Sequence, residues 1–179
     1  MKEKTLQKFD QLQQSKRTLL KELSTLSENE LNHSEHSKDW SIAQVCYHLY
    51  MIEEFSLNYM KKKTTDIKQL KRSGLKESLK SKLLSFTLAL PLKYKAPKMV
   101  SEGIPEVVDW ASLLQEWESV RQELYDYITS LPDEAFHLNL FRHPVTGLIN
   151  IQQTLTFYQS HFDHHLPQIR NHLSKLTPA

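Results

Sequence analysis

The sequence predicts an all-α protein, and three observations favour a four-helix bundle. Glycine occurs only three times among 179 residues, and the seven prolines leave long gaps between them. Four long segments repeat their apolar residues with the 3.6-residue period of an amphipathic helix. Four such helices bury their apolar faces most economically by packing side by side. Because the length is that of one ordinary domain, we expect residues 1–179 to form a single helical bundle domain.

The first helix is predicted over residues 4–26, where leucines and one phenylalanine recur at helical spacing. A short turn follows, because Ser27 and Glu30 have the spacing of a capping box, in which side chains satisfy free N–H groups at a helix start. The second long helix has Ser41 as its N-cap and Gln44 as the capping partner, and it extends to about residue 62.

The third long helix is predicted to open at Asp109, with an apolar stripe that continues to residue 131. The fourth opens at Asn150, with Gln153 as its capping partner, and runs to about residue 174. Pro167 lies inside this last segment and has no backbone N–H, so we expect a bend or an early end near it.

A basic stretch separates the second helix from the third. Residues 61–98 contain 12 lysines and arginines against two acidic residues, a local charge of +10, whereas the rest of the chain carries −8. The stretch also holds an apolar run at residues 83–92 that must be buried. We interpret it as a long crossover with one short helix. A solvated connector is one interpretation of its charge, and an anion-attracting rim or a membrane-surface contact is the other.

Composition excludes several classes of function. Three scattered glycines cannot form a P-loop or a dinucleotide-binding fingerprint, and the single cysteine, Cys46, rules out an internal disulfide framework and a Cys-rich zinc site. The net charge of +2 argues against a dedicated nucleic-acid-binding domain. The N-terminal residues lack the apolar core of a signal peptide, and no run reaches the roughly 18 apolar residues of a membrane span. We therefore expect a cytoplasmic protein.

Nine histidines invite a search for metal ligands, and helix geometry selects three of them. The apolar stripe of the fourth helix centres on Phe162; at about 100° per residue, His165 lies about 60° and His161 about 100° from it on the same side. His164 lies about 160° away, towards solvent. Histidines four apart share a helix face and can share a metal. In the second helix, His48 lies about 60° from the apolar stripe and offers a third ligand.

A neutral three-histidine set with an open fourth position is typical of catalytic zinc-type sites. The same spacing also arises by coincidence in histidine-rich helices, which is the competing interpretation. Cys46 lies about 200° round the helix from His48, so it cannot face the same ion, and we expect it to be a buried apolar residue.

Several motifs taken together resemble the DinB/YfiT-like family of metalloenzymes, over nearly the whole chain. They are Trp40-Ser41-Ile42-Ala43-Gln44-Val45-Cys46-Tyr47-His48-Leu49, Trp117-Glu118-x-x-Arg121, His143-Pro144-x-x-Gly147 and His161-x-x-His164-His165-x-x-Gln168-Ile169. The resemblance implies a four-helix bundle that holds a divalent metal through one histidine of helix two and an H-x-x-x-H pair of helix four. Those residues are His48, His161 and His165 here, and we expect Zn²⁺ or Ni²⁺.

The resemblance also implies an activity on a small molecule: transfer of a low-molecular-weight thiol to an electrophile, thiol-dependent isomerisation, or metal-dependent hydrolysis. No obvious carboxylate accompanies the three histidines as a general base, so the catalytic residues stay unassigned. We rank thiol transfer ahead of hydrolysis because a metal can bind and deprotonate a thiol without a separate strong base. The alternative is a non-catalytic stress-response or binding module whose metal is structural or absent. A homodimer is a further expectation, and no nucleic-acid partner is expected.

Three further residues are candidates for lining a substrate pocket: Arg121, Tyr158 and His143. Arg121 lies inside the apolar stripe of the third helix, so its charge needs a partner. We prefer a structural ion pair with an acid of a neighbouring helix to an anchor for a substrate anion. Core packing is the alternative role for Tyr158, and turn formation is the alternative for His143. Trp40 is expected to pack as a hydrophobic staple before the second helix.

Overall fold

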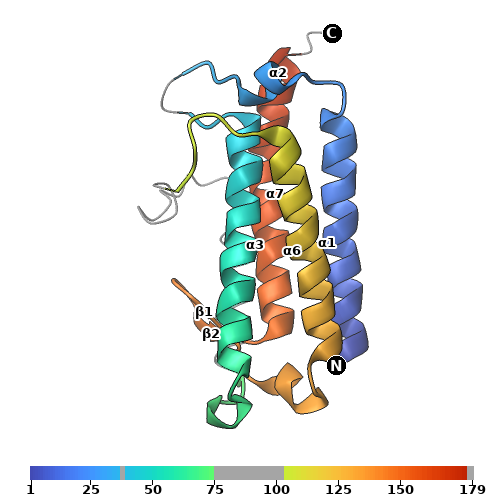
Figure 1. The fold of residues 1–179 in the computed structure, drawn as a ribbon, viewed down its shortest axis with the longest axis vertical. Coiled ribbons are helices and arrows are strands. Elements are labelled where there is room, and N and C mark those ends of the chain that lie inside the picture. Colours follow the sequence, from blue (N-terminus) through green and yellow to red (C-terminus); the bar gives the residue numbers. More distant parts are fainter. Residues whose placement is uncertain (37–38, 75–102, 177–179) are drawn as a thin grey trace.

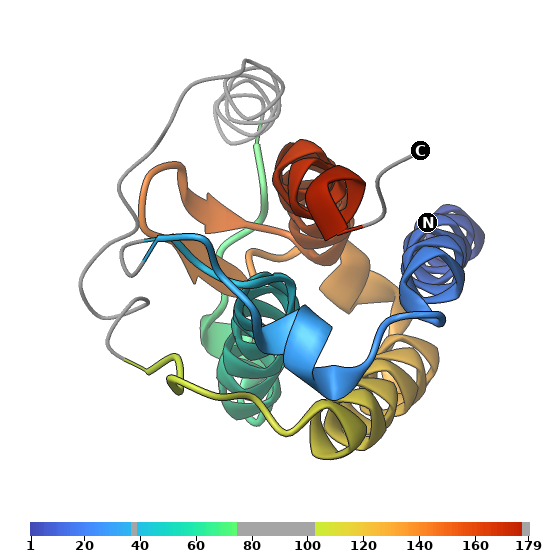
Figure 2. The same ribbon diagram turned by 90° about the horizontal axis from the view of Figure 1, so that it is seen from above.

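The computed structural model describes residues 1–36, 39–74 and 103–176, and its long helices form a four-helix bundle (Figure 1). These helices are α1 (Lys2–Leu23), α3 (Ile42–Thr64), α6 (Trp110–Ser130) and α7 (Ile151–Leu176). α1 packs on α6 and α7, and α3 packs on the same two helices. As Figure 2 shows from above, α1 and α3 therefore occupy opposite corners of the bundle.

The chain runs up through α1, down through α3, down through α6 and up through α7 (Figure 1). Because α3 and α6 are parallel neighbours, the end of α3 and the start of α6 lie at opposite ends of the bundle, as a long crossover between them requires. Its described ends contain η1 (Ile67–Gln69) and one isolated bridge between Arg72 and Leu138. The apolar run at 83–92 and the short helix predicted for the crossover lie outside the described residues.

Capping side chains mark the helix starts that the sequence predicts. In each capping box, two side chains satisfy backbone N–H groups that have no partner within the helix. The pairs are Ser27 with Glu30 before α2 (Glu28–Asn32), Ser41 with Gln44 before α3, and Asn150 with Gln153 before α7. At α6, the Asp109 carboxylate accepts the backbone N–H of Ser112. These four starts are confirmed.

One helix end differs from the prediction, and Pro167 does not shorten the last helix. α1 ends three residues early, because the backbone N–H groups that follow it bond three residues back instead of four. α7 ends at Leu176, close to the predicted residue 174, and continues through Pro167. A proline costs a helix interior about 3 kcal/mol, and the fully buried side chains of Phe162 and Ile169, on either side of Pro167, hold the helix in the bundle.

The core is filled by apolar side chains from all four long helices. Leu12, Ile42, Trp117 and Phe162 are each fully buried, one from each long helix. α2 lies across one end of the bundle and buries Leu31 there (Figure 1). No helix in the described part of the chain is both long enough and apolar enough to cross a membrane.

A small β-hairpin connects α6 to α7, after the short helix η2 (Asp133–His137). Its strands are β1 (Phe141–His143) and β2 (Gly147–Ile149), which pair antiparallel. The sequence predicts only a turn at this place. The hairpin lies beside α3 (Figure 1) and so carries His143 to the flank of the bundle.

Candidate metal centre

Three histidines from two helices meet at the edge of the bundle core, where His48 is buried and His161 and His165 are half-buried. His48 comes from the N-terminal end of α3, and His161 and His165 lie one turn apart on α7. The Nε2 atom of His161 is 3.1 Å from Nε2 of His48 and 3.2 Å from Nε2 of His165. One nitrogen of each ring lies within 4.8 Å of the corresponding nitrogens of the other two. The structure thus brings together the three residues that the helix angles select.

The spacing of these nitrogens suits a small divalent cation. In a tetrahedral zinc site, Zn–N bonds of about 2.0–2.1 Å place neighbouring ligand nitrogens about 3.3 Å apart. Both Nε2 distances are close to that value. Hydrogen bonds alone account poorly for the cluster, because each neutral ring offers one N–H and one lone pair. A single N–H cannot point at two nitrogens at once, whereas a cation accepts all three lone pairs.

A glutamine sets the tautomer of one ring. The Nδ1 atom of His165 lies 3.0 Å from the amide oxygen of Gln168, about one turn further along α7. Because an amide oxygen only accepts hydrogen bonds, His165 carries its proton on Nδ1 and turns the lone pair of Nε2 towards the other rings. Metal-binding histidines are commonly oriented by such a bond on the second nitrogen. The Nδ1 atom of His48 is buried and has no hydrogen-bond partner among the described residues.

Aromatic side chains pack against the other two histidines. The ring centroid of Trp40 lies 5.1 Å from that of His48. Phe157 stacks on His161, with centroids 5.4 Å apart and 20° between the ring planes. From the sequence, Trp40 is expected only as a hydrophobic staple, and Phe157 is not predicted to take part. The position of Phe157, four residues before His161 on one helix face, is the signal that identifies it.

Burial keeps the cluster uncharged near neutral pH. Removal from water lowers the pKa of His48 to about 3 and the pKa of His161 well below its ordinary value of 6.5. The same cause lowers the pKa of His165, although its hydrogen bond to Gln168 opposes the shift. Neighbouring imidazoles add to the shift at all three rings. Neutral imidazole is the form that binds metals.

Arg121 is engaged in the core of the bundle. Its Nε and Nη2 atoms donate to the two carboxylate oxygens of Glu53 at 2.5 and 2.8 Å, and its Nη1 donates to the amide oxygen of Gln13 at 2.8 Å. The indole N–H of Trp117 donates to the same carboxylate at 3.1 Å. Arg121 is 0 % exposed. It therefore forms the structural ion pair preferred in the sequence analysis, and its guanidinium has no exposed surface to offer a substrate.

Tyr158 and His143 are also buried side chains. Tyr158 is 2 % exposed and belongs to the hydrophobic core. In the hairpin, the Nδ1 atom of His143 accepts the backbone N–H groups of Val145 and Thr146 at 3.2 and 3.3 Å. The ring of His143 lies 4.5 Å from that of Phe157, which stacks in turn on the cluster. His143 thus acts in the turn, and it packs against the ring that stacks on His161.

Three further residues near the histidine cluster can be compared with what the sequence predicts for them. His164 is half-buried, with its ring 5.3 Å from that of His165, so the prediction that it points into solvent is wrong. Cys46 is fully buried as expected, and burial raises its pKa to about 12. Among the described residues, Glu53 is the one buried carboxylate, and Arg121 and Trp117 already hold it.

These features define a class of protein: an all-α bundle whose interior carries three converging histidines that could hold a metal ion. The chain belongs to the DinB superfamily, whose family model matches residues 11–169. This assignment agrees with the resemblance carried by the sequence motifs.

Two proteins of Bacillus subtilis are similar to this chain. The uncharacterized protein YuaE of strain 168 is 28 % identical over 158 residues, which cover 88 % of this chain and 92 % of YuaE. The fold is similar to that of YfiT, with a TM-score of 0.60 and 17 % identity, covering 98 % of this chain and 86 % of YfiT. YfiT is described as "a probable metal-dependent hydrolase with an unusual four-helix bundle topology". At this level of identity the likeness to YfiT establishes the fold.

Proposed function

We propose that His48, His161 and His165 bind one divalent metal ion and that the protein is a metal-dependent enzyme acting on a small molecule. The observation that carries the proposal is the convergence of three Nε2 atoms, with His161 3.1 and 3.2 Å from the other two. The description of YfiT as a probable metal-dependent hydrolase supports it. Three protein ligands leave the fourth position of a tetrahedral ion open for water or substrate.

When bound, a divalent ion on three neutral ligands lowers the pKa of a coordinated water or thiol towards neutrality and so supplies a nucleophile. The residues of the chain prepare the ligand rings for that role. Gln168 holds the proton of His165 on Nδ1, and Phe157 stacks against His161. Burial keeps all three imidazoles neutral, so their lone pairs are available.

Transfer of a low-molecular-weight thiol to an electrophilic carbon is our first candidate reaction. It requires no strong base from the protein, which agrees with the engagement of Glu53 by Arg121 and Trp117. Hydrolysis is the second candidate, and the description of YfiT favours it. Histidine nitrogens suit zinc and nickel, which we propose as the resident ions. The homodimer stays a prediction.

Elemental mass spectrometry on the untagged protein tests the metal centre. We expect about one equivalent of Zn or Ni in the parent, as a His₃ site binds a single ion, and none in His161→Ala/His165→Ala. His172→Ala is the matched control, because it removes a histidine of α7 outside the cluster, and it should retain the metal. Circular dichroism separates loss of metal from loss of fold. A parent protein that stays metal-free after incubation with Zn²⁺ and Ni²⁺ overturns the proposal.

Turnover assays on the metal-loaded parent distinguish the candidate reactions. Consumption of a small thiol in the presence of an alkyl or aryl halide supports thiol transfer, and cleavage of an ester without added thiol supports hydrolysis. Either activity should disappear in His161→Ala/His165→Ala. Stoichiometric metal without turnover in either assay would favour a structural metal in a binding module.

A further inference from the structure

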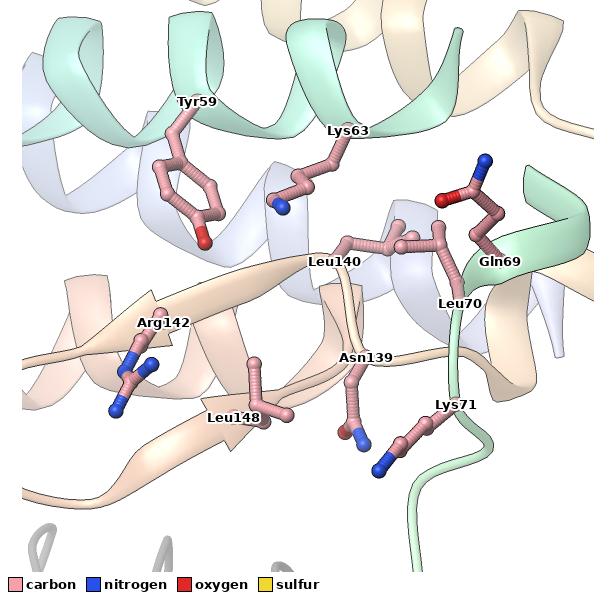
Figure 3. A pocket seen from close by; sticks show the side chains of 9 residues that line it. All are labelled: Tyr59, Lys63, Gln69, Leu70, Lys71, Asn139, Leu140, Arg142 and Leu148. Carbon is pink, nitrogen blue, oxygen red and sulfur yellow. The ribbon is translucent and has the colours of Figure 1, made fainter. Parts of the chain in front are cut away.

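A second concave site lies between α3 and the β-hairpin, away from the histidines. It is a pocket of about 210 Å³. Figure 3 shows Tyr59 and Lys63 extending from α3 towards the hairpin, with Arg142 on β1 and Leu148 on β2. Lys63 lies 15 residues beyond His48 on α3, about 22 Å along the helix axis. The pocket is therefore separate from the candidate metal centre.

All charged side chains that line this pocket are cations. Lys63, Lys71 and Arg142 line it, and no acidic residue does. None of the three forms an ion pair with another described residue, although five other cations in the described ranges do. Those five are Lys16, Lys61, Arg121, Arg170 and Lys175. Three uncompensated cations around one pocket create a local potential that attracts a multiply charged anion.

A buried amide in the pocket wall provides a second, independent observation. Asn139 is 5 % exposed, and its backbone N–H donates to the carbonyl oxygen of Lys71 at 2.9 Å. Its side-chain nitrogen donates to the carbonyl oxygen of Arg72 at 3.3 Å. Its Oδ1 atom is buried and has no hydrogen-bond partner among the described residues. A buried acceptor without a donor is costly, and because this oxygen has almost no accessible surface, a ligand hydroxyl or N–H group would bond to it only after a small shift of the wall exposes it.

We propose that this pocket binds a small organic phosphate, namely a phosphomonoester whose body carries a hydrogen-bond donor and a short apolar part. The three cations would hold the phosphate dianion, because guanidinium and ammonium groups are the usual phosphate partners in proteins. A carboxylate would leave two of the three positive charges uncompensated. The apolar part of the ligand has a matching wall in Tyr59, Leu70, Leu140 and Leu148.

Isothermal titration with 4-aminophenyl phosphate tests the proposal. The protein used is His161→Ala/His165→Ala with its helical content verified, so that phosphate cannot bind at a metal. We expect saturable binding at least tenfold tighter than that of 4-aminobenzoate, on charge grounds, and at least tenfold weaker binding when Lys71→Gln/Arg142→Gln is added. Lys62→Gln/Lys68→Gln is the matched control. It removes two exposed charges of the same basic stretch that do not line the pocket, and binding should stay within twofold.

Three outcomes would overturn the proposal that this pocket binds a phosphomonoester. One is the absence of saturable binding, and another is equal weakening by the two double variants, which indicates diffuse attraction. The third comes from vesicles that contain phosphatidic acid. If the protein binds these vesicles but not the soluble phosphate, the basic residues contact a lipid surface instead. Because the tested protein lacks His161 and His165, none of these outcomes bears on the metal proposal.

Discussion

His161 and His165 turn towards the same interior space because they lie one turn apart on a helix whose buried face contains Phe162. This relation needs only the helix period, so the sequence is sufficient to select the pair. His164 shows where such reasoning stops. The direction of its Cα–Cβ bond predicts solvent, yet its ring packs against His165. The contacts of a side chain depend on its rotamer and its length, and the angular position of the residue around the helix axis specifies neither.

Gln168 is a positioning residue for His165, and its removal should weaken metal binding. Gln168→Ala removes the amide oxygen that lies 3.0 Å from Nδ1 of His165 and accepts its proton. We expect affinity for Zn²⁺ to fall about 10–100-fold, with unchanged helical content because alanine favours helices. Competition titration against a chromophoric chelator measures the change. Gln152→Ala, near the start of the same helix, is the control and should bind like the parent. Equal affinities in all three proteins would show that His165 needs no such support.

The long helices could be predicted because local signals mark both their faces and their starts. Ser41 and Gln44 form the expected capping box, and Ile42, Val45 and Leu49, which begin the expected stripe, are buried. The hairpin could not be predicted, since strands of three residues are too short to show an alternating pattern. Only its turn leaves a trace in the sequence. Gly147 has a φ of +79°, a left-handed conformation that glycine adopts without steric cost.

The hairpin should also contribute a pH dependence to stability, through His143. Burial lowers the pKa of His143 to about 4 in the folded protein, against about 6.5 when unfolded. Between these values the unfolded chain binds more protons, so the free energy of unfolding decreases as the pH falls from about 6.5 to about 4. The full effect is about 3 kcal/mol. Protonation would also place an N–H on Nδ1, which now accepts the backbone N–H groups of Val145 and Thr146.

Urea unfolding of the parent and of His143→Asn at pH 7 and pH 5 measures this effect. An asparagine side chain can accept the same backbone N–H groups but does not titrate. The three histidines of the cluster also have lowered pKa values, so they too make the free energy of unfolding decrease as the pH falls. The quantity compared between the two proteins is therefore the decrease in the free energy of unfolding from pH 7 to pH 5. We expect a smaller loss in His143→Asn. The same loss in both proteins would remove His143 from the acid response.

At the scale of the whole molecule, ion pairs that involve buried side chains connect helices that the sequence alone cannot order. Glu53 of α3 is bonded to Arg121 of α6, which also donates to Gln13 of α1. Lys16 of α1 is 2 % exposed and meets Glu118 of α6 at 2.6 Å. Amphipathic stripes specify that four helices pack together, but several arrangements bury the same stripes. The sequence shows that Arg121 needs an acid, and only the fold shows which acid lies opposite.

The Glu53–Arg121 pair should therefore be the most sensitive polar contact in the bundle. Its side chains are 4 % and 0 % exposed, so Glu53→Gln leaves a buried guanidinium without a counter-charge and should cost about 3–5 kcal/mol of unfolding free energy. Lys61→Gln is the control, because it breaks the exposed Lys61–Glu123 pair between the same two helices. That loss should stay below about 1 kcal/mol. Urea denaturation at pH 7 measures both.

A compensating variant separates the orphaned charge from the loss of the contact itself. Glu53→Gln/Arg121→Met removes both charges and keeps side chains of similar length, so it should be more stable than Glu53→Gln alone. The Trp117 N–H, which now donates to the Glu53 carboxylate at 3.1 Å, can still reach the amide oxygen of the new glutamine. If instead the double variant is the less stable protein, the Arg121 side chain stabilises the bundle even without its counter-charge, through contacts such as its hydrogen bond to Gln13 of α1.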